Sequence, residues 1–343
     1  MTATAERANA ILVDDGWRRW IAENLMLDNS PESIFQTLVG HGMPAMIAEA
    51  ELNKALASPY LHGAHRLRNR LAKRDWLLDI QRKLNRLHPQ GHEIERRQQL
   101  SADEFLRDYY CGNRPVIITG MMDDWPALQR WSFDYFRRRC GRSEVEVQFG
   151  RNSDTNYEIN QPRLKRVMKF ADYVDLVEQS GITNDFYMTA NNNSQNKQAL
   201  AELWQDIVQV PAYLDGNSPD NGFFWFGPAG TRTPFHHDLT NNFMAQVIGR
   251  KRVRLMPACE LPYVYNQTHC YSLVDGNDIN LEQFPLMQHA QVLECVLNPG
   301  EILFLPVGCW HYVEGLEVTV TISFINFRWD NDFSSFYHTF HEV

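Results

Sequence analysis

The feature that most constrains the fold of this chain is the sequence pattern of residues 223–327. Short runs of apolar and β-branched residues follow one another there, and each run is closed by Gly, Pro or Asn. Many short strands separated by turn residues are typical of a sandwich or a barrel. Residues 115–120, 145–149 and 186–189 are shorter runs of the same kind. We therefore predict a mainly β domain over most of the chain after residue 98.

The first hundred residues have a helical pattern instead. Apolar side chains recur at steps of three and four over residues 17–25, and Ser-Pro at 30–31 marks another helix start. A longer helix, rich in Arg and Lys, is expected over 63–87. A solvated face is the simplest explanation of that charge. We therefore predict a helical N-terminal region over residues 1–97 and a β domain over residues 98–343.

The composition of the chain indicates which binding partners and which cellular compartment to expect. The net charge of -9 repels a phosphate backbone and disfavours nucleic acid as the main ligand. Residues 1–10 have no apolar signal core, and no stretch is long and apolar enough to cross a bilayer. None of the six cysteines forms a CxxC pair, which is typical of reduced thiols. We expect a cytoplasmic protein with no membrane partner and no nucleic-acid partner.

The strongest local signal is the sequence Thr-Pro-Phe-His-His-Asp that ends at Asp238. His236 and Asp238 lie two residues apart, and on a strand that spacing puts both side chains on one face. An imidazole and a carboxylate that point the same way supply two ligands of a metal site. His237 points to the opposite face and is excluded as a partner. Such a pair also occurs by chance in many chains, so it needs further support.

A third ligand has to come from another strand. Residues 298–306 read as a turn, a buried strand and a break, and Trp310 and His311 follow. A histidine beside a core strand is well placed to complete a triad with His236 and Asp238. Two histidines and one carboxylate with open positions are the ligands of non-haem iron(II) oxygenases. The open positions accept a bidentate 2-oxo acid and then dioxygen.

Lys251 is the second candidate binding residue. Alternation along residues 247–255 puts it on the face of Val253 and Leu255, while three arginines share the other face. A lysine on an inward apolar face needs an anionic partner, because an unpaired buried charge is very costly. The distal carboxylate of 2-oxoglutarate would serve, and so would an ordinary Asp or Glu of the chain.

The last β run, residues 318–324, has two chemically distinct faces. Val and Ile alternate there with Thr319, Thr321 and Ser323. A row of small hydroxyls suits the lining of a polar cavity, and it equally suits a half-exposed sheet face. The pattern alone leaves both interpretations open.

Together these motifs resemble the JmjC and cupin-like 2-oxoglutarate-dependent oxygenases. Within that family, the likeness is strongest to the asparaginyl hydroxylase that inhibits hypoxia-inducible factor. The resemblance covers about residues 100–330 and rests on several ordered motifs. They are T-x-x-H-x-D, an asparagine six residues past the histidine, A-Q-x-x-G-x-K, P-G-E-x-L-x-x-P and W-H. Here they comprise Thr233, His236, Asp238, Asn242, Ala245, Gln246, Gly249, Lys251, Pro299, Gly300, Glu301, Pro306, Trp310 and His311.

The resemblance implies a fold and a set of binding residues. The fold would be a double-stranded β-helix, a cupin-like jelly roll, with N-terminal helices. Iron(II) would be bound by His236, Asp238 and His311. The distal carboxylate of 2-oxoglutarate would be held by Thr233, Lys251 and Tyr187, and Asn242 would lie near its iron-bound end. The family often has an asparagine on the last core strand, where this chain offers Ser323 by register or Asn326 by chemistry.

The implied function is a hydroxylase that uses iron(II), 2-oxoglutarate and O2. It would act on a C–H bond of an amino-acid side chain in a protein or peptide, with succinate and CO2 as coproducts. Hydroxylation of a free amino acid or small metabolite is the alternative. A cupin metalloenzyme without 2-oxoglutarate, in which a carboxylate of the chain pairs with Lys251, and a non-catalytic interaction protein are alternatives of other classes.

The two ends of the chain carry weaker expectations. The N-terminal helices are interpreted as a cap on the barrel, with substrate entry or a dimer contact as alternatives. Residues 332–343 are a candidate helix that pairs two subunits into a homodimer.

Overall fold

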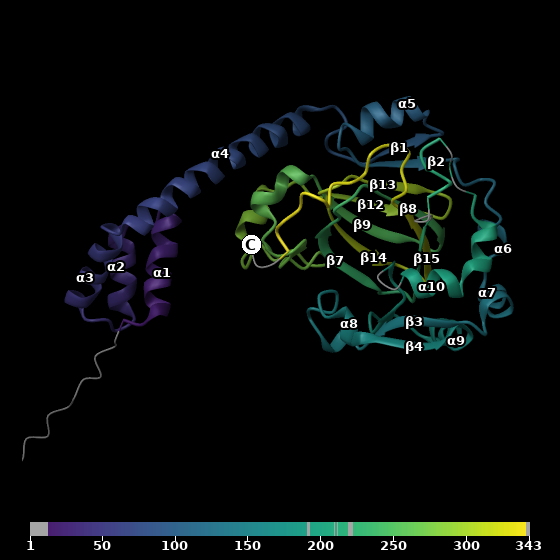
Figure 1. Ribbon diagram of the computed structural model, residues 1–343, viewed down its shortest axis with the longest axis horizontal. Coiled ribbons are helices and arrows are strands. Elements are labelled where there is room, and N and C mark those ends of the chain that lie inside the picture. The colour runs from purple at the N-terminus through teal and green to yellow at the C-terminus, as the bar shows by residue number, and fades with distance from the viewer. Residues whose placement is uncertain (1–12, 191–192, 209, 211, 219–221, 341–343) are drawn as a thin grey trace, which may run out of the picture. The chain divides into compact units, whose positions relative to one another are not determined.

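The computed structural model describes residues 13–190, 193–208, 210, 212–218 and 222–340 (Figure 1). The expected polar N-terminus, residues 1–10, therefore lies outside the described residues. By its contacts the chain divides into two units, Met1–Ile80 and Gln81–Val343, which we describe separately. No helix in the described part of the chain combines the length and the apolar content needed to cross a bilayer.

The N-terminal unit is helical, as predicted. It contains α1 (Asp15–Met26), α2 (Pro31–Gly40), α3 (Ala45–Leu56) and the first part of α4 (Pro59–Leu87). Ser30 caps α2 by accepting a hydrogen bond from the Ser33 amide, and a proline in the first turn loses no helical bond. One buried residue per helical turn builds the core of this unit; the set is Ile21, Leu25, Ile34, Leu38, Ala48, Leu52 and Leu61.

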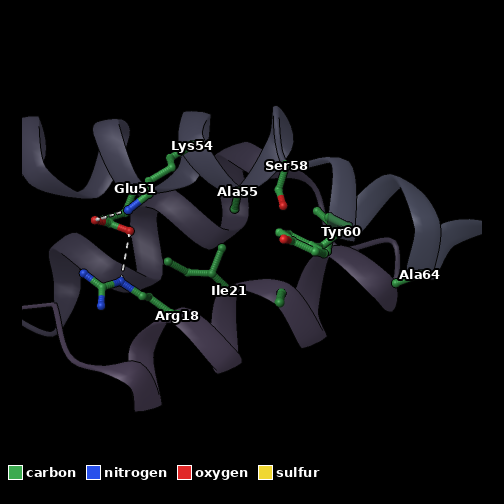
Figure 2. A pocket seen from close by; sticks show the side chains of 10 residues that line it. Arg18, Ile21, Glu51, Lys54, Ala55, Ser58, Tyr60 and Ala64 are labelled. Atoms are coloured by element: carbon green, nitrogen blue, oxygen red, sulfur yellow. Dashed lines mark hydrogen bonds and ion pairs between the residues drawn. The ribbon is translucent and has the colours of Figure 1, made fainter.

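A groove of about 390 Å³ lies in the same unit, between α1, α3 and the start of α4 (Figure 2). Its walls are largely apolar, with Ile21 and Ala55 on opposite sides. Arg18 and Glu51 form an ion pair of 3.4 Å at its edge. Among the described residues, no cluster of metal-ligating residues lies in this groove.

The second unit begins with the end of α4. Arg82 and Arg86 both donate to the carbonyl oxygen of His289, and Arg86 lies 3.6 Å from the buried carboxylate of Glu260. The helix ends at Leu87 before a turn that contains Pro89 and Gly91, residues that commonly end helices. The end of α4 is thereby attached to the β domain.

Two six-stranded sheets form the β domain within the described residues. The first has the order β1 (Glu95–Gln98), β2 (Val116–Thr119), β13 (Ile302–Leu305), β8 (Asn242–Ile248), β15 (Thr319–Phe324) and β6 (Phe223–Gly227). The second has the order β10 (Asn266–Thr268), β11 (Tyr271–Ser272), β7 (Arg232–His237), β14 (Trp310–Gly315), β9 (Lys251–Met256) and β12 (Leu293–Leu297). The predicted mainly β jelly roll with N-terminal helices is confirmed.

The order of strands brings together segments that are far apart in the sequence. All pairs within the two sheets are antiparallel except β1 with β2. Alternate residues of β9, β13 and β14 point between the sheets and form an apolar core that includes Val253, Leu303 and Val313. Lys251, Leu305 and His311 lie two residues from these core residues on the same strands, so the same inward face also lines a central cavity.

Helices cover the outer face of the first sheet (Figure 1). Phe136 of α7 (Phe133–Cys140) and Phe170 of α9 (Phe170–Gln179) pack on Phe224 and Phe226 of β6. A small third sheet has the order β4 (Lys165–Lys169), β3 (Glu144–Phe149) and β5 (Phe186–Tyr187). The shorter helices are α5 (Ala102–Glu104), α6 (Ala127–Arg130), α8 (Gln161–Leu164) and α10 (Asn193–Ala199).

The expected domain boundary between residues 97 and 98 falls inside β1. That strand pairs with β2 at the edge of the first sheet, and the division by contacts lies earlier, after Ile80. The segment 81–98 is thus part of the β unit although its sequence has no strand periodicity. Its strand of four residues, Glu-Arg-Arg-Gln, is too polar to be recognised from pattern.

The prediction of a helix over residues 332–343 is wrong for the described residues up to 340, which form turns and extended chain. Asp332 accepts hydrogen bonds from Ser334 and Ser335, and such local bonds compete with a helix. Further along, Tyr337 and Phe340 pack on the ring of His269. Residues 341–343 lie outside the described residues, and the homodimer stays a prediction.

The six cysteines are free thiols, as expected. Cys111 is exposed and the other five are buried. Most of the five are scattered over the β domain as small apolar side chains, which is the commonest role of a free cysteine.

Candidate active site

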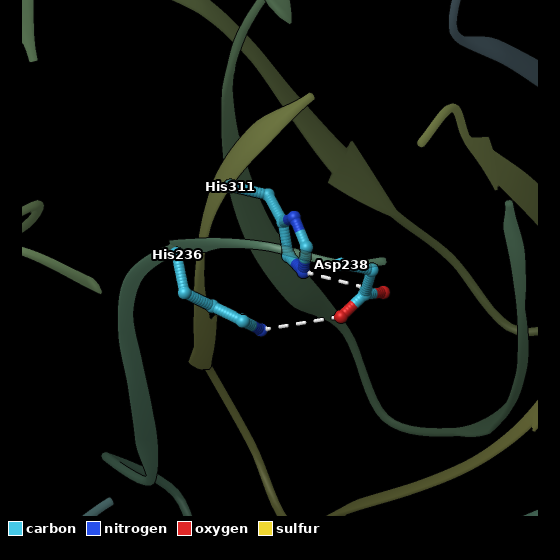
Figure 3. A group of neighbouring side chains, drawn as sticks. All are labelled: His236, Asp238 and His311. Atoms are coloured by element: carbon cyan, nitrogen blue, oxygen red, sulfur yellow. Dashed lines mark ion pairs between the residues drawn. The ribbon is translucent and has the colours of Figure 1, made fainter. Parts of the chain in front are cut away.

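The three predicted metal ligands meet at one end of the second sheet. β7 pairs with β14 so that His236 lies opposite His311, and Asp238 follows directly after β7. One ligand atom of each residue lies within 4.8 Å of the others, and Figure 3 shows the three side chains converging. The Asp238 carboxylate is 3.7 Å from His236 Nε2 and 4.0 Å from His311 Nε2. This spacing leaves room for one ion between the three side chains.

Both histidines are oriented by the same local bond. The Nδ1–H of His236 donates to the carbonyl of Pro234 at 2.9 Å, and that of His311 donates to the carbonyl of Cys309 at 3.0 Å. A carbonyl oxygen only accepts, so each Nδ1 carries the proton and each Nε2 keeps its lone pair. The two lone pairs are therefore available to a metal.

Electrostatics keep Asp238 and His311 in the protonation states that a cation needs. Burial, together with the neighbouring His236, lowers the pKa of His311 to about 4, so the ring is neutral at pH 7. Burial alone would raise the pKa of Asp238, but the two imidazoles and a hydrogen bond from Asn242 lower it overall. A negative carboxylate beside the neutral imidazole of His311 is favourable for a divalent ion.

His237 points away from the triad, as its place on the strand predicts. Its ring packs edge-on against Trp310, with 4.9 Å between centroids, and burial lowers its pKa. Among the described residues, the one cluster of metal-ligating groups is His236, Asp238 and His311.

The donor set fits iron(II). Two imidazole nitrogens and one carboxylate oxygen leave other coordination positions open toward the cavity, which is the pattern of non-haem iron oxygenases. Asn242 Nδ2 donates to Asp238 Oδ2 at 3.0 Å and fixes the carboxylate. Asn242 Oδ1 is buried without a hydrogen-bond partner among the described residues, so the site has a polar atom left to satisfy.

Lys251 is placed as its alternation predicts. It is 2% exposed, and its ammonium donates to the hydroxyl of Tyr187 at 3.1 Å. No Asp or Glu of the described chain forms an ion pair with it, and burial lowers its pKa to about 7. The anionic partner expected for this residue is thus not a carboxylate of the described protein.

The predicted cosubstrate residues share one cavity with the triad. It is lined by Tyr187, Trp225, Thr233, His236, Asp238, Asn242, Met244, Lys251, Leu305, His311, Val313 and Ser323. The metal ligands lie at one end of β7 and β14, whereas Lys251 faces Gly315 at the other end of β14. A molecule with a charged group at each end matches this arrangement.

Of the two alternatives on the last strand, Ser323 lines the cavity. Its hydroxyl accepts a hydrogen bond from Trp225 Nε1 at 2.9 Å. Asn326 lies beyond the strand, where its side-chain amide donates to the carbonyl of Asp215, and it is not among the lining residues. All six residues of β15 are buried, so the half-exposed interpretation of this strand is wrong. Thr321 donates instead to Gln246 of the neighbouring β8.

A larger cavity of about 290 Å³ continues outward from the triad. It shares Trp225, Thr233 and Ser323 with the inner cavity and adds Glu158, Tyr271 and other side chains. The ring of Tyr271 stacks on that of His236, 5.9 Å between centroids.

Sequence reasoning missed Trp225, Tyr271 and Glu158. Trp225 alternates with Phe224 and Phe226 of β6, and that period would have placed it on the cavity face. Tyr271 belongs to a strand of two residues, and Glu158 lies in a run of turns, so neither carries a periodic signal.

Comparison with known proteins agrees with this geometry. A family model described as a cupin-like domain matches residues 101–335. The chain is 36% identical over 232 residues to the lysine-specific demethylase 8 of Xenopus tropicalis, covering 65% of this chain and 50% of that protein. It is 35% identical over 253 residues to the lysine-specific demethylase JMJ30 of Arabidopsis thaliana, covering 71% and 56%.

A third relative is the human bifunctional peptidase and (3S)-lysyl hydroxylase JMJD7, which is 27% identical over 251 residues, covering 64% of this chain and 79% of that protein. The chain spans about half the length of the two demethylases that it matches. The family match contains the triad, Lys251 and every strand from β2 to β15. The protein therefore belongs to the cupin-like domain family, among its JmjC members.

Proposed function

We propose that the protein is an iron(II)- and 2-oxoglutarate-dependent hydroxylase. It would act on a C–H bond of an amino-acid side chain in a protein or peptide. The observation that carries the proposal is a buried lysine with no carboxylate partner among the described residues, in the same cavity as a His-Asp-His triad. A ligand that both chelates a metal and presents a second carboxylate fits these two features together.

The residues have separate tasks in this proposal. His236, Asp238 and His311 hold iron(II), and Lys251, Tyr187 and Thr233 hold the distal carboxylate of 2-oxoglutarate. With O2, the bound iron and 2-oxoglutarate supply an oxidation in which one oxygen atom goes to succinate, with loss of CO2, and the other to a substrate C–H bond. The Asn242 side chain keeps the Asp238 carboxylate in its orientation while ligands exchange.

The cavity supports binding of a dianion in a further way. Lys251 is only about half protonated at pH 7 without a ligand, because burial lowers its pKa to about 7. A carboxylate beside the ammonium would favour the charged form and bring the proton back. Leu305, Val313 and Met244 surround the two charges with apolar atoms, which exclude water and strengthen their attraction.

The substrate side of the site favours an amino-acid side chain over a bulky cofactor-like molecule. The outer cavity is lined by aromatic rings and, apart from Asp238, by one carboxylate, that of Glu158. Aromatic faces attract a basic group, and the Glu158 carboxylate, although paired with Arg151, adds negative potential beside them. A lysine side chain, hydroxylated or oxidatively demethylated, is therefore a second candidate, and the names of the three relatives favour it. The likeness to an asparaginyl hydroxylase stays a prediction.

The alternatives are separable by simple measurements. In a cupin enzyme without 2-oxoglutarate, a carboxylate of the chain would pair with Lys251, and the Tyr187 contact speaks against it. A non-catalytic protein would bind iron weakly or not at all. A free amino acid or small metabolite differs from a peptide only at the substrate side, so it would give the same succinate release.

The decisive experiment incubates the protein with iron(II), 2-oxoglutarate and panels of peptides and free amino acids. We expect succinate formation together with a product that is heavier by one oxygen atom, seen by mass spectrometry. Demethylation would instead release formaldehyde and lighten the peptide by one methylene group. Iron binding without any succinate, across both panels and in the absence of substrate, would contradict the proposal.

A further inference from the structure

Arg151 is a buried cation that the proposed chemistry leaves unused. It is 1% exposed and lies in the turn that follows β3. Burying a guanidinium is costly unless its N–H groups are paired, so its contacts indicate what the residue holds in place. One contact is the hydrogen bond from Nη1 to Gln148 Oε1 at 2.7 Å, and another is the ion pair from Nη2 to Glu158 Oε1 at 3.0 Å.

Two further contacts of Arg151 lead to the expected binding site of the distal carboxylate. Its guanidinium lies over the ring of Tyr187, 5.2 Å from the centroid, and the hydroxyl of that tyrosine accepts the bond from Lys251. Its Nη2 donates to the carbonyl of Arg232, the residue directly before Thr233. One side chain thus holds Tyr187 through its ring and Thr233 through the adjacent backbone.

The surroundings reinforce this arrangement. The hydroxyl of Tyr157 donates to the same Arg232 carbonyl at 3.2 Å, and the Tyr157 ring lies 4.3 Å from the guanidinium. Gln148, which accepts from Arg151, is paired in register with Tyr187 across β3 and β5. Arg151 therefore sits between the third sheet and β7 and fixes their separation beside the cavity.

The ion pair gives Arg151 a second connection, to the substrate side. Glu158 lines the outer cavity beside the triad, and it also lines a neighbouring hollow of about 190 Å³ together with Tyr271. Glu158 is 7% exposed, and its carboxylate has Arg151 as its ion-pair partner in the described chain. A chain of contacts thus connects Glu158 through Arg151 to Tyr187 and the start of β7.

We propose that Arg151 is a positioning residue for 2-oxoglutarate, which holds Tyr187 and Thr233 against the distal carboxylate and links that contact to the substrate cavity through Glu158. The inference rests on the proposed function. Arg151 is not one of the metal-ligating residues, so the expected effect falls on binding of the distal carboxylate and not on the chelate.

The test compares two ligands of the full-length protein loaded with manganese(II), which replaces iron(II) and does not react with O2. 2-Oxoglutarate reports the chelate and the distal carboxylate together, whereas oxalate chelates a metal and has no distal carboxylate. Titration calorimetry of Arg151→Met should show a Kd for 2-oxoglutarate that is raised roughly tenfold, with oxalate affinity unchanged. Arg151→Lys should give an intermediate Kd, because it keeps the charge and loses the planar fork.

Controls separate this role from a purely structural one. Arg130 also pairs with a buried carboxylate, that of Asp206, but lines neither cavity, so Arg130→Met should leave both affinities unchanged. If Arg151→Met does not fold, Glu158→Gln carries the test, with a smaller rise of the 2-oxoglutarate Kd and no change for oxalate.

Three results would overturn the role of Arg151. They are an unchanged 2-oxoglutarate Kd, an equal loss for oxalate, and an equal loss in the Arg130 control. A wild-type protein that binds manganese and oxalate but not 2-oxoglutarate would instead refute the proposed function itself, and the role of Arg151 would fall with it.

Discussion

His236 and His311 face each other across β7 and β14, and each donates its Nδ1–H to the carbonyl of the residue two positions earlier. The backbone of each strand therefore selects the tautomer of the ring that it carries. Neither histidine needs a second side chain to expose its Nε2 lone pair toward Asp238. The geometry of the candidate metal site is thus built into the strand pairing, and the predictions below follow from it and from the cavity beside it.

The first prediction concerns the carboxylate of the triad. Asp238→Ala removes one of three ligands and should weaken manganese(II) binding by more than roughly 100-fold, beyond the effect typical of outer partners. Succinate formation should disappear with it. The matched control is His237→Gln, since His237 points to the other face and is not in the triad. Wild-type succinate formation in Asp238→Ala would refute the assignment.

The second prediction concerns the residue that holds that carboxylate. Asn242→Ala removes the 3.0 Å bond to Asp238 Oδ2 and should weaken metal binding by roughly tenfold, as for other outer partners. If negative charge alone matters, Asn242→Asp should weaken metal binding less than Asn242→Ala does. If the N–H donor matters, Asn242→Asp should weaken metal binding at least as much as Asn242→Ala. We expect the latter result in a metal titration, because the bond to Asp238 requires a donor.

The third prediction concerns stability and pH. The folded pKa of Lys251 is about 7, below its ordinary value of 10.5, so the unfolded chain binds the extra proton between these values. Between pH 7 and pH 9, the free energy of unfolding of the wild type should therefore rise by roughly 2 kcal/mol relative to that of Lys251→Met. Chemical denaturation of both proteins without ligand measures the difference. A constant difference across this range would show that Lys251 is not desolvated.

The fourth prediction concerns the cosubstrate. Binding of a distal carboxylate requires the charged form of Lys251, whose pKa in the free protein is about 7. The Kd of 2-oxoglutarate should therefore rise with pH above 7, by up to about tenfold per pH unit, until the pKa of the complex is reached. Calorimetry in buffers of different ionisation enthalpy should detect proton uptake on binding. The Kd of oxalate, which does not reach Lys251, should not show this dependence.

Much of the site was predictable because it lies on strands. A period of two places His236 with Asp238, excludes His237, and turns Lys251 inward, and the structure has all of these orientations. Helix starts were predictable for a similar reason, since the Ser30 cap is a local property.

The remaining parts depend on contacts that no local pattern records. Arg151 and Glu158 lie in irregular segments and meet through the fold alone. The choice between Ser323 and Asn326 depended on where β15 ends, and a strand end is set by its neighbours. The C-terminal segment was misjudged because Asp332 and the following serines bond to one another in place of a helix.

The burial of the thiols has a consequence for a protein with the proposed oxygen-dependent function. Burial raises the pKa of Cys140 and Cys259 to about 11 and that of Cys270, Cys295 and Cys309 to about 12. Peroxide and related by-products attack the thiolate far faster than the thiol. At pH 7 nearly every one of these sulfurs keeps its proton, so under the proposed function the scaffold around the triad would resist oxidation by such by-products. The exposed Cys111 is the sulfur that would record such events first.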